Sequence, residues 1–173
     1  MFITNHALAG ATLGLLTRRP AVAFVTGMAS HVAMDMVLHW GDERLDWDGF
    51  VEVAKVDGTL GLAVCAGLLA LAPVPTRPAV AAGIAGACLI DLDKPARHFL
   101  GRSPFPPVVD RLHARIQRQR PTGLLVEAAA AAGLVALIGP LHRRRHRQRH
   151  RPGLSRGAGA GAGGAAPACR HPR

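Results

Sequence analysis

The segment Ser-His-Val-Ala-Met-Asp-Met-Val-Leu-His-Trp, residues 30–40, carries three ionisable side chains four residues apart inside a long apolar run. These are His31, Asp35 and His39. On an α-helix, a spacing of four rotates successive side chains by only about 40°, so a helix here would put all three on one face. Burying such groups among apolar residues is unfavourable unless a partner satisfies them. The segment therefore predicts a polar site that binds a metal or handles protons.

The composition favours a helical membrane protein. Of the 173 residues, 49% are hydrophobic and only 18% are charged, which leaves little polar material to cover a soluble surface. Five apolar runs are rich in Ala, Leu and Gly and do not alternate polar with apolar residues, so they are not strands. The runs cover residues 2–16, 21–40, 58–74, 79–92 and 123–141. We predict an all-α, multi-pass integral membrane bundle of about five apolar helices over residues 1–141.

The five runs differ in length. A helix needs about 20 apolar residues to cross a bilayer, which runs 21–40 and 123–141 reach and run 58–74 nearly reaches. Runs 2–16 and 79–92 are shorter, and we expect them to be re-entrant, tilted or packed inside the bundle.

The segments between the runs are polar. We expect an acidic loop over residues 41–57 and a short polar helix over 108–120. Small residues three or four apart predict close helix packing, although a coding bias towards Ala, Gly and Arg produces the same pattern. The groups are Gly10–Gly14, Gly58–Gly61 and Gly83–Gly86–Ala87. The membrane orientation stays open, because basic segments flank the last apolar run on both sides.

The formal charge of +10 comes from the C-terminal tail. Residues 142–173 hold nine arginines and no acidic residue, and they become Gly/Ala-rich towards the end. Such a composition does not bury a core, so we predict a disordered tail that contacts anionic lipid through residues 143–151. The remaining Lys and Arg residues nearly balance the 11 Asp and Glu, and no basic face with interleaved aromatic residues appears. We therefore expect no specific nucleic-acid partner.

Ionisable residues in or beside the apolar runs form four groups. Imidazole together with carboxylate is the ligand set expected of zinc, or of manganese or iron where oxygen dominates. Each group also has a plainer interpretation as a helix cap, a polar turn or a solvated face. The groups are His6 with Thr4 and Asn5, then His31 with Asp35 and His39, then Asp91 with Asp93, and finally Asp110 with His113.

The spacing within the groups predicts a shared centre. Asp91 and Asp93 would diverge on a helix, but Pro95 favours an extended backbone at Lys94, and in an extended segment both carboxylates point the same way. We expect the pair to converge with His6, His31 and Asp35, because a shared metal would satisfy all of these groups at once.

The other three candidates are placed around that centre. His113 would act as a further metal ligand from the polar helix. His39 lies two turns beyond His31 on the expected helix, about 12 Å along its axis, so it is too far for the same ion. We expect His39 and Asp110 to support the ligands from outside.

Three motifs carry a resemblance to a known family. They are Thr4-Asn5-His6-x-x-x-Gly10, Ser30-His31 with Asp35, and Leu89-Ile90-Asp91-Leu92-Asp93. Over about residues 1–140 the chain resembles the bacterial membrane-bound metal-dependent hydrolases, the LexA-regulated inner-membrane family, which is distantly similar to zinc-dependent phospholipase C. The resemblance implies a location in the bacterial cytoplasmic (inner) membrane. The metal ligands that it implies are His6, His31, Asp35, Asp91 and Asp93.

The chain also departs from that family. The family commonly has His after the two aspartates, where this chain has Lys94. The family's His-Arg-x-x-Thr-His-Ser segment is matched only in part, by Asp110-Arg111-Leu112-His113.

The expected function is metal-dependent hydrolysis. A bound divalent metal, with zinc expected first, lowers the pKa of its water, and Asp35 or Asp93 would act as the general base. By analogy with the family, the substrate is a phosphoester at the membrane interface, such as a lipid headgroup. The alternative is a non-enzymatic membrane protein whose cluster handles protons or ions, or bonds helices together.

Overall fold

The computed structural model describes residues 1–42 and 44–149, and the chain within them is mostly helical, as predicted. Side chains are described up to residue 141, so most of the predicted tail lies outside the described residues. Within the described part there are seven α-helices, which are α1 (Ile3–Thr17), α2 (Pro20–Asp35), α3 (Trp47–Leu71), α4 (Arg77–Cys88), α5 (Asp93–Leu100), α6 (Pro107–Ile116) and α7 (Leu124–Arg149). The shorter elements are the 3-10 helices η1 (Val74–Thr76), η2 (Ile90–Leu92) and η3 (Pro121–Gly123) and the two-residue strands β1 (His39–Trp40) and β2 (Gln119–Arg120).

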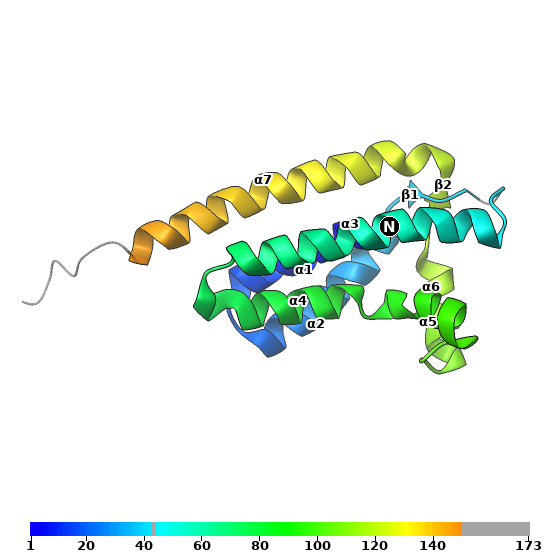
Figure 1. The fold of residues 1–173 in the computed structure, drawn as a ribbon, viewed down its shortest axis with the longest axis horizontal. Helices are drawn as coiled ribbons and strands as arrows, with labels where there is room; N and C mark the ends of the chain where they lie inside the picture. The colour runs from blue at the N-terminus through cyan, green and yellow to red at the C-terminus, as the bar shows by residue number, and fades with distance from the viewer. Residues whose placement is uncertain (43, 150–173) are drawn as a thin grey trace, which may run out of the picture.

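Helix α1 lies at the centre of the bundle. It packs against α2 and α4 on one side and against α3 and α7 on the other (Figure 1). Its residues are buried from Asn5 to Leu15 with the exception of Leu13. An apolar core forms between Ala11, Leu15 and Val80, and part of α7 packs against it.

Glycines allow α1, α2 and α4 to meet backbone to backbone. A methyl group added at Gly10 would overlap the carbonyl of Gly83, and one added at Gly83 would overlap the carbonyl of Gly10. In the same way, a methyl group at Gly86 would overlap the carbonyl of Phe24 on α2. By contrast, Gly58 on α3 has nothing within 4 Å of such a group. The predicted close packing is therefore present at Gly10 and Gly83 and absent at Gly58.

Two of the described helical segments are long and apolar enough to cross a membrane, by length and composition. They are Trp47–Leu71 and Pro121–Leu141, and only 6% of the apolar window in each is buried inside the bundle. The predicted helix over 21–40 is wrong at its end, because α2 stops at Asp35 after 16 residues. Helix α3 in turn starts inside the expected acidic loop, where the Asp46 carboxylate accepts a hydrogen bond from the Gly49 N–H at 2.8 Å and caps it.

Short elements at one end of the bundle depart from the predicted all-helical pattern. Strands β1 and β2 pair in parallel, with His39 opposite Gln119, so the polar helix predicted over 108–120 already ends at Ile116. Residues 93–100 form α5, because Pro95 lies in the first turn, where a missing N–H costs no helical hydrogen bond. At this end, α2 and α4 finish and α3 and α7 begin (Figure 1).

Candidate metal site

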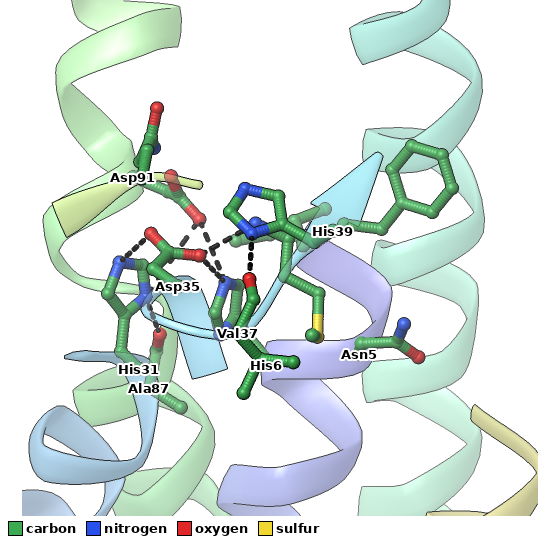
Figure 2. Close-up of polar contacts among 12 residues, drawn as sticks. Asn5, His6, His31, Asp35, Val37, His39, Ala87 and Asp91 are labelled. Carbon is green, nitrogen blue, oxygen red and sulfur yellow. Dashed lines mark hydrogen bonds and ion pairs between the residues drawn. The ribbon is translucent and has the colours of Figure 1, made fainter. Parts of the chain in front are cut away.

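Six of the predicted site residues gather where these helices meet. His6 lies near the start of α1, and His31 and Asp35 lie in the last turns of α2. Asp91 belongs to η2, Asp93 opens α5 and His113 lies on α6. His6, His31 and Asp35 are fully buried, Asp91 and His113 are buried, and Asp93 is half-buried. Figure 2 shows His6 from α1, His31 and Asp35 from α2, and Asp91 from η2 pointing toward one another.

Three of these side chains form an equilateral triangle of potential ligand atoms. Nε2 of His31 lies 3.3 Å from Oδ2 of Asp35, and Nε2 of His113 lies 3.3 Å from the same oxygen. The two Nε2 atoms are also 3.3 Å apart. Bonds of about 2.0–2.1 Å to a tetrahedral ion put neighbouring ligand atoms about 3.3–3.4 Å apart. The triangle therefore has the dimensions of one face of a zinc coordination tetrahedron, which leaves the fourth position open.

The surroundings orient these ligand atoms. Nδ1–H of His31 donates a hydrogen bond to the carbonyl of Ala87 at 2.7 Å, which leaves the lone pair on Nε2, facing Asp35 (Figure 2). On the other histidine, Nδ1 of His113 lies 3.6 Å from Oδ2 of Asp93. A carbonyl or carboxylate behind a histidine fixes its tautomer and raises its basicity as a ligand. Asp93 and Ala87 thus occupy the positions of the groups that orient the histidine ligands in a metal site.

His6 and Asp91 extend the cluster beyond the triangle. Nε2 of His6 lies 3.2 Å from Oδ1 of Asp35 and 3.8 Å from Oδ2 of Asp91. His6, His31 and Asp91 form a second group that could hold an ion, and Asp91, Asp93 and His113 form a third. Nδ1 of His31 is the ring atom nearest Asp91, at 3.9 Å, and the carbonyl of Ala87 already engages it. The triangle around Asp35 is therefore the best-formed position.

Two buried atoms of the cluster have no hydrogen-bond partner among the described residues. They are Nδ1 of His6 and Oδ1 of Asp93. A buried polar atom without a partner is costly, so such atoms call for a water molecule, an ion or a catalytic role to explain them. Neither atom belongs to the triangle, so they are further buried positions beside it that a water molecule or an ion could satisfy.

Positive groups offset the carboxylate charge around the site. The Lys94 ammonium forms an ion pair with Asp91, and the N-terminal ammonium of Met1 lies 2.6 Å from Oδ1 of Asp35. Burial disfavours the charged form of His113, but contacts with the Asp35 and Asp93 carboxylates outweigh it and raise its pKa to about 9. At neutral pH His113 therefore carries a proton that a metal ion would have to displace.

Backbone hydrogen bonds hold α6 against the end of α2. The Arg118 N–H donates to the Asp35 carbonyl at 3.2 Å, and the His39 N–H donates to the Arg118 carbonyl at 3.0 Å. The β1–β2 pairing continues this ladder. It brings His113 to residues that lie about 80 positions earlier in the chain, a long-range contact that local sequence patterns do not contain.

Two sequence-based predictions about the candidate residues are wrong. His39 does not share a helical face with His31 and Asp35, because α2 ends before it. His39 is buried in β1, its Nδ1–H donates to the Val37 carbonyl at 2.8 Å, and its Nε2 has no partner among the described residues. Asp91 and Asp93 do not lie in an extended segment. Their backbone is helical, and both carboxylates nevertheless reach His113 from η2 and α5.

Asp110 lies away from the cluster. Its carboxylate binds Arg97 at 2.6 Å and Ser103 at 2.8 Å. These contacts fix α5 to α6, the two helices that carry Asp93 and His113. Within the described residues, Asp110 forms no hydrogen bond or ion pair with those two side chains.

Two buried or half-buried carboxylates were missed from the sequence. Glu127 on α7 accepts hydrogen bonds from the Asn5 side-chain amide at 2.7 Å and from the backbone N–H groups of Phe2 and Trp40 at 3.2 and 3.3 Å. Asp57 on α3 accepts from the Ile3 N–H at 2.6 Å and the Thr4 hydroxyl at 2.7 Å. The signal for Glu127 was a single acidic residue inside the apolar run 123–141. Both carboxylates anchor a candidate membrane helix to the start of α1.

No protein-family model, curated protein or solved structure matches the chain. Membership of the hydrolase family that the motifs resemble is therefore not shown. The structure supports a coarser conclusion, which is that a mostly helical protein with two candidate membrane spans has a buried His/Asp cluster that could hold a metal ion.

Proposed function

We propose that this protein is a membrane-bound, metal-dependent hydrolase that acts on a phosphoester at the membrane interface. The observation that carries the proposal is the 3.3 Å triangle of His31, Asp35 and His113. Three protein ligands with one open position are typical of catalytic zinc sites, whereas structural zinc sites are closed by four. Zinc is accordingly the proposed metal. The motif resemblance to inner-membrane hydrolases supports the same reaction class and a bacterial inner-membrane location.

The site residues divide into ligands and supporting groups. A divalent cation held by the triangle would lower the pKa of a water molecule in its open fourth position and so supply a nucleophile at neutral pH. His31, Asp35 and His113 would hold it, while His6 and Asp91 belong with His31 to an adjacent group of potential ligands. Asp93 is the better candidate for the general base, because its Oδ1 has no partner among the described residues, whereas both oxygens of Asp35 are engaged.

The position of Lys94 favours an anionic substrate. Its ammonium contacts Asp91 at the edge of the cluster, and its side chain is 29% exposed. A positive group that reaches both solvent and a metal site suits a phosphate oxygen, because charge-assisted hydrogen bonds to phosphate are strong. The position at which the family commonly has His would thus bind substrate in this chain.

The apolar exterior supports the membrane location. The outward faces of α3 and α7 expose large apolar side chains that water would not favour. They include Val56, Leu60, Leu62 and Leu71 on α3 and Leu124, Leu125, Val135 and Leu137 on α7. Membrane lipid is the partner that this surface fits, and the cluster would lie near the end of both spans.

One observation favours the non-enzymatic alternative. Asp35 already contacts His6, His31, His113 and the N-terminal ammonium, so the cluster has internal partners for much of its charge. Such a network could bond helices together or pass protons without a metal. Metal content separates the two functions.

The test is elemental analysis of the full-length protein purified in detergent, after dialysis against zinc and removal of excess metal. We expect bound zinc in the wild type and its loss in His31→Ala, Asp35→Ala and His113→Ala. His98→Ala, which removes an exposed histidine of α5, and His142→Ala should keep it. Zinc-dependent cleavage of a phosphodiester would then support hydrolysis. Full metal content in all three site variants would contradict the proposal and favour the non-enzymatic alternative.

A further inference from the structure

Helices α5 and α6 present a second face, turned away from the metal cluster. Their inner sides carry Asp93 and His113, whereas no residue of α5 is fully buried. Phe99 is 77% exposed, and other large apolar side chains of this pair are similarly open. They are Leu100 on α5 and Val108 and Leu112 on α6. An apolar surface of this kind on short helices indicates a binding partner.

Helix α6 and the segments that flank the helix pair are also basic. Arg97 pairs with Asp110 at 2.6 Å and ties the two helices together. The exposed guanidinium groups of α6 and of the segments beside it have no acidic partner within the described residues. They belong to Arg102, Arg111, Arg115, Arg118 and Arg120. Basic residues interleaved with large apolar side chains are typical of helices that lie in the interface of an anionic membrane.

The position of the pair fits that partner. The ring of Trp47, the first residue of α3, lies 6.3 Å from the ring of His98 on α5. Helix α6 leads through β2 and η3 directly into α7. The pair therefore sits where both candidate spans begin, at the end of the bundle (Figure 1). Aromatic and basic residues gather at this level in membrane proteins, where spans leave the hydrocarbon layer.

We propose that the outer face of α5 and α6 docks into the headgroup layer of an anionic lipid bilayer. Phe99, Val108 and Leu112 insert below the phosphates, and Arg111 and Arg115 bind the phosphates. This inference rests on the membrane location given under the proposed function. It adds that Asp93 and His113, on the inner side of the same helices, are held at headgroup level, so a lipid phosphoester reaches the cluster without leaving the bilayer.

The test uses the full-length protein with Cys65, Cys88 and Cys169 replaced by Ala and with Val108→Cys carrying an environment-sensitive fluorophore. The protein is placed in nanodiscs of phosphatidylcholine with increasing fractions of phosphatidylglycerol, and quenching by brominated acyl chains is measured. We expect quenching to rise with the anionic lipid and to fall as salt screens the charges. Arg111→Gln/Arg115→Gln should lower the equilibrium constant for docking, obtained from the quenching curve, by about fivefold per arginine, the factor that corresponds to about 1 kcal/mol per basic residue.

The matched control is Arg18→Gln/Arg19→Gln, which removes the same charge from the turn between α1 and α2, at the opposite end of the bundle (Figure 1). This control should leave the quenching curve unchanged. Equal response of both double variants, or no dependence on anionic lipid, would overturn the inference. A fluorophore that responds to an added oligonucleotide and not to lipid would also overturn it. Zinc content is measured on the same samples, so loss of the metal proposal and loss of the lipid proposal are distinguishable.

Discussion

Glu127 is expected to be the strongest single anchor of α7. Glu127 is 2% exposed, and its carboxylate accepts hydrogen bonds from three residues. These are Phe2 just before α1, Asn5 in α1 and Trp40 in β1. Glu127→Ala would remove the acceptor and leave these donors without a partner in a poorly hydrated place. The variant tests whether a carboxylate inside a candidate membrane helix holds the bundle together.

The magnitude follows from the number of donors. A buried donor left without a partner costs about 1–3 kcal/mol, and hydrogen bonds to charged groups contribute about 1.5–3 kcal/mol each. Phe2 and Trp40 are only half-buried, so water entering the cavity would recover part of the loss. We expect Glu127→Ala to lose roughly 3–5 kcal/mol of unfolding free energy, a large fraction of the 5–15 kcal/mol typical of a domain. Glu127→Gln keeps one acceptor oxygen and should lose about half as much.

The assay is thermal or denaturant unfolding of the detergent-solubilised protein, followed by circular dichroism. Glu52→Gln is the matched control, because Glu52 lies on α3 in an exposed pair with Lys55, and exposed pairs contribute little. The order of stability should be wild type and Glu52→Gln first, then Glu127→Gln, then Glu127→Ala. If Glu127→Ala unfolds together with Glu52→Gln, the carboxylate is not an anchor and the reasoning is wrong.

Two further predictions concern pH and packing. Zinc affinity should increase by up to about tenfold per pH unit below pH 9 and then level off. The reason is the raised pKa of His113, since a proton competes with the metal for this side chain below that pH. Competition with a chelator from pH 6 to pH 9 measures the affinity, and a flat profile would contradict the prediction. Gly83→Ala should lose about 1–3 kcal/mol of unfolding free energy, because its methyl group would overlap the Gly10 carbonyl. Gly58→Ala has open space around it and should gain about 0.5–1 kcal/mol, because alanine lowers the backbone entropy of the unfolded chain. Equal unfolding free energies of the two glycine variants would refute the packing argument.

The sequence predicted the local parts of the site better than the long-range ones. The spacing of four placed His31 and Asp35 on one helical face, and both lie in the last turns of α2. The same reasoning failed for His39, because pairing of β1 with β2 ends the helix after Asp35 and no local pattern announces that pairing. Asp91 and Asp93 come together on a helical backbone, since two successive short helices turn the chain between them.

The number of membrane-length helices was predicted less well. An apolar run sets an upper limit on a helix, but caps and tertiary hydrogen bonds set its ends, as Asp46 does for α3. Run 21–40 therefore gave a shorter helix than its length indicated, and run 58–74 gave a longer one. Glu127 was overlooked because one carboxylate hardly changes the mean hydropathy of an apolar run, although it decides where that run is attached.

The central claim is that His31, Asp35 and His113 hold a divalent metal ion. The most direct measurement is an anomalous difference map at the zinc absorption edge, from crystals of the full-length protein grown with zinc. We expect a peak about 2 Å from Nε2 of His31, Oδ2 of Asp35 and Nε2 of His113. A map with no peak within the cluster, or with zinc bound only by histidines elsewhere in the chain, would contradict it.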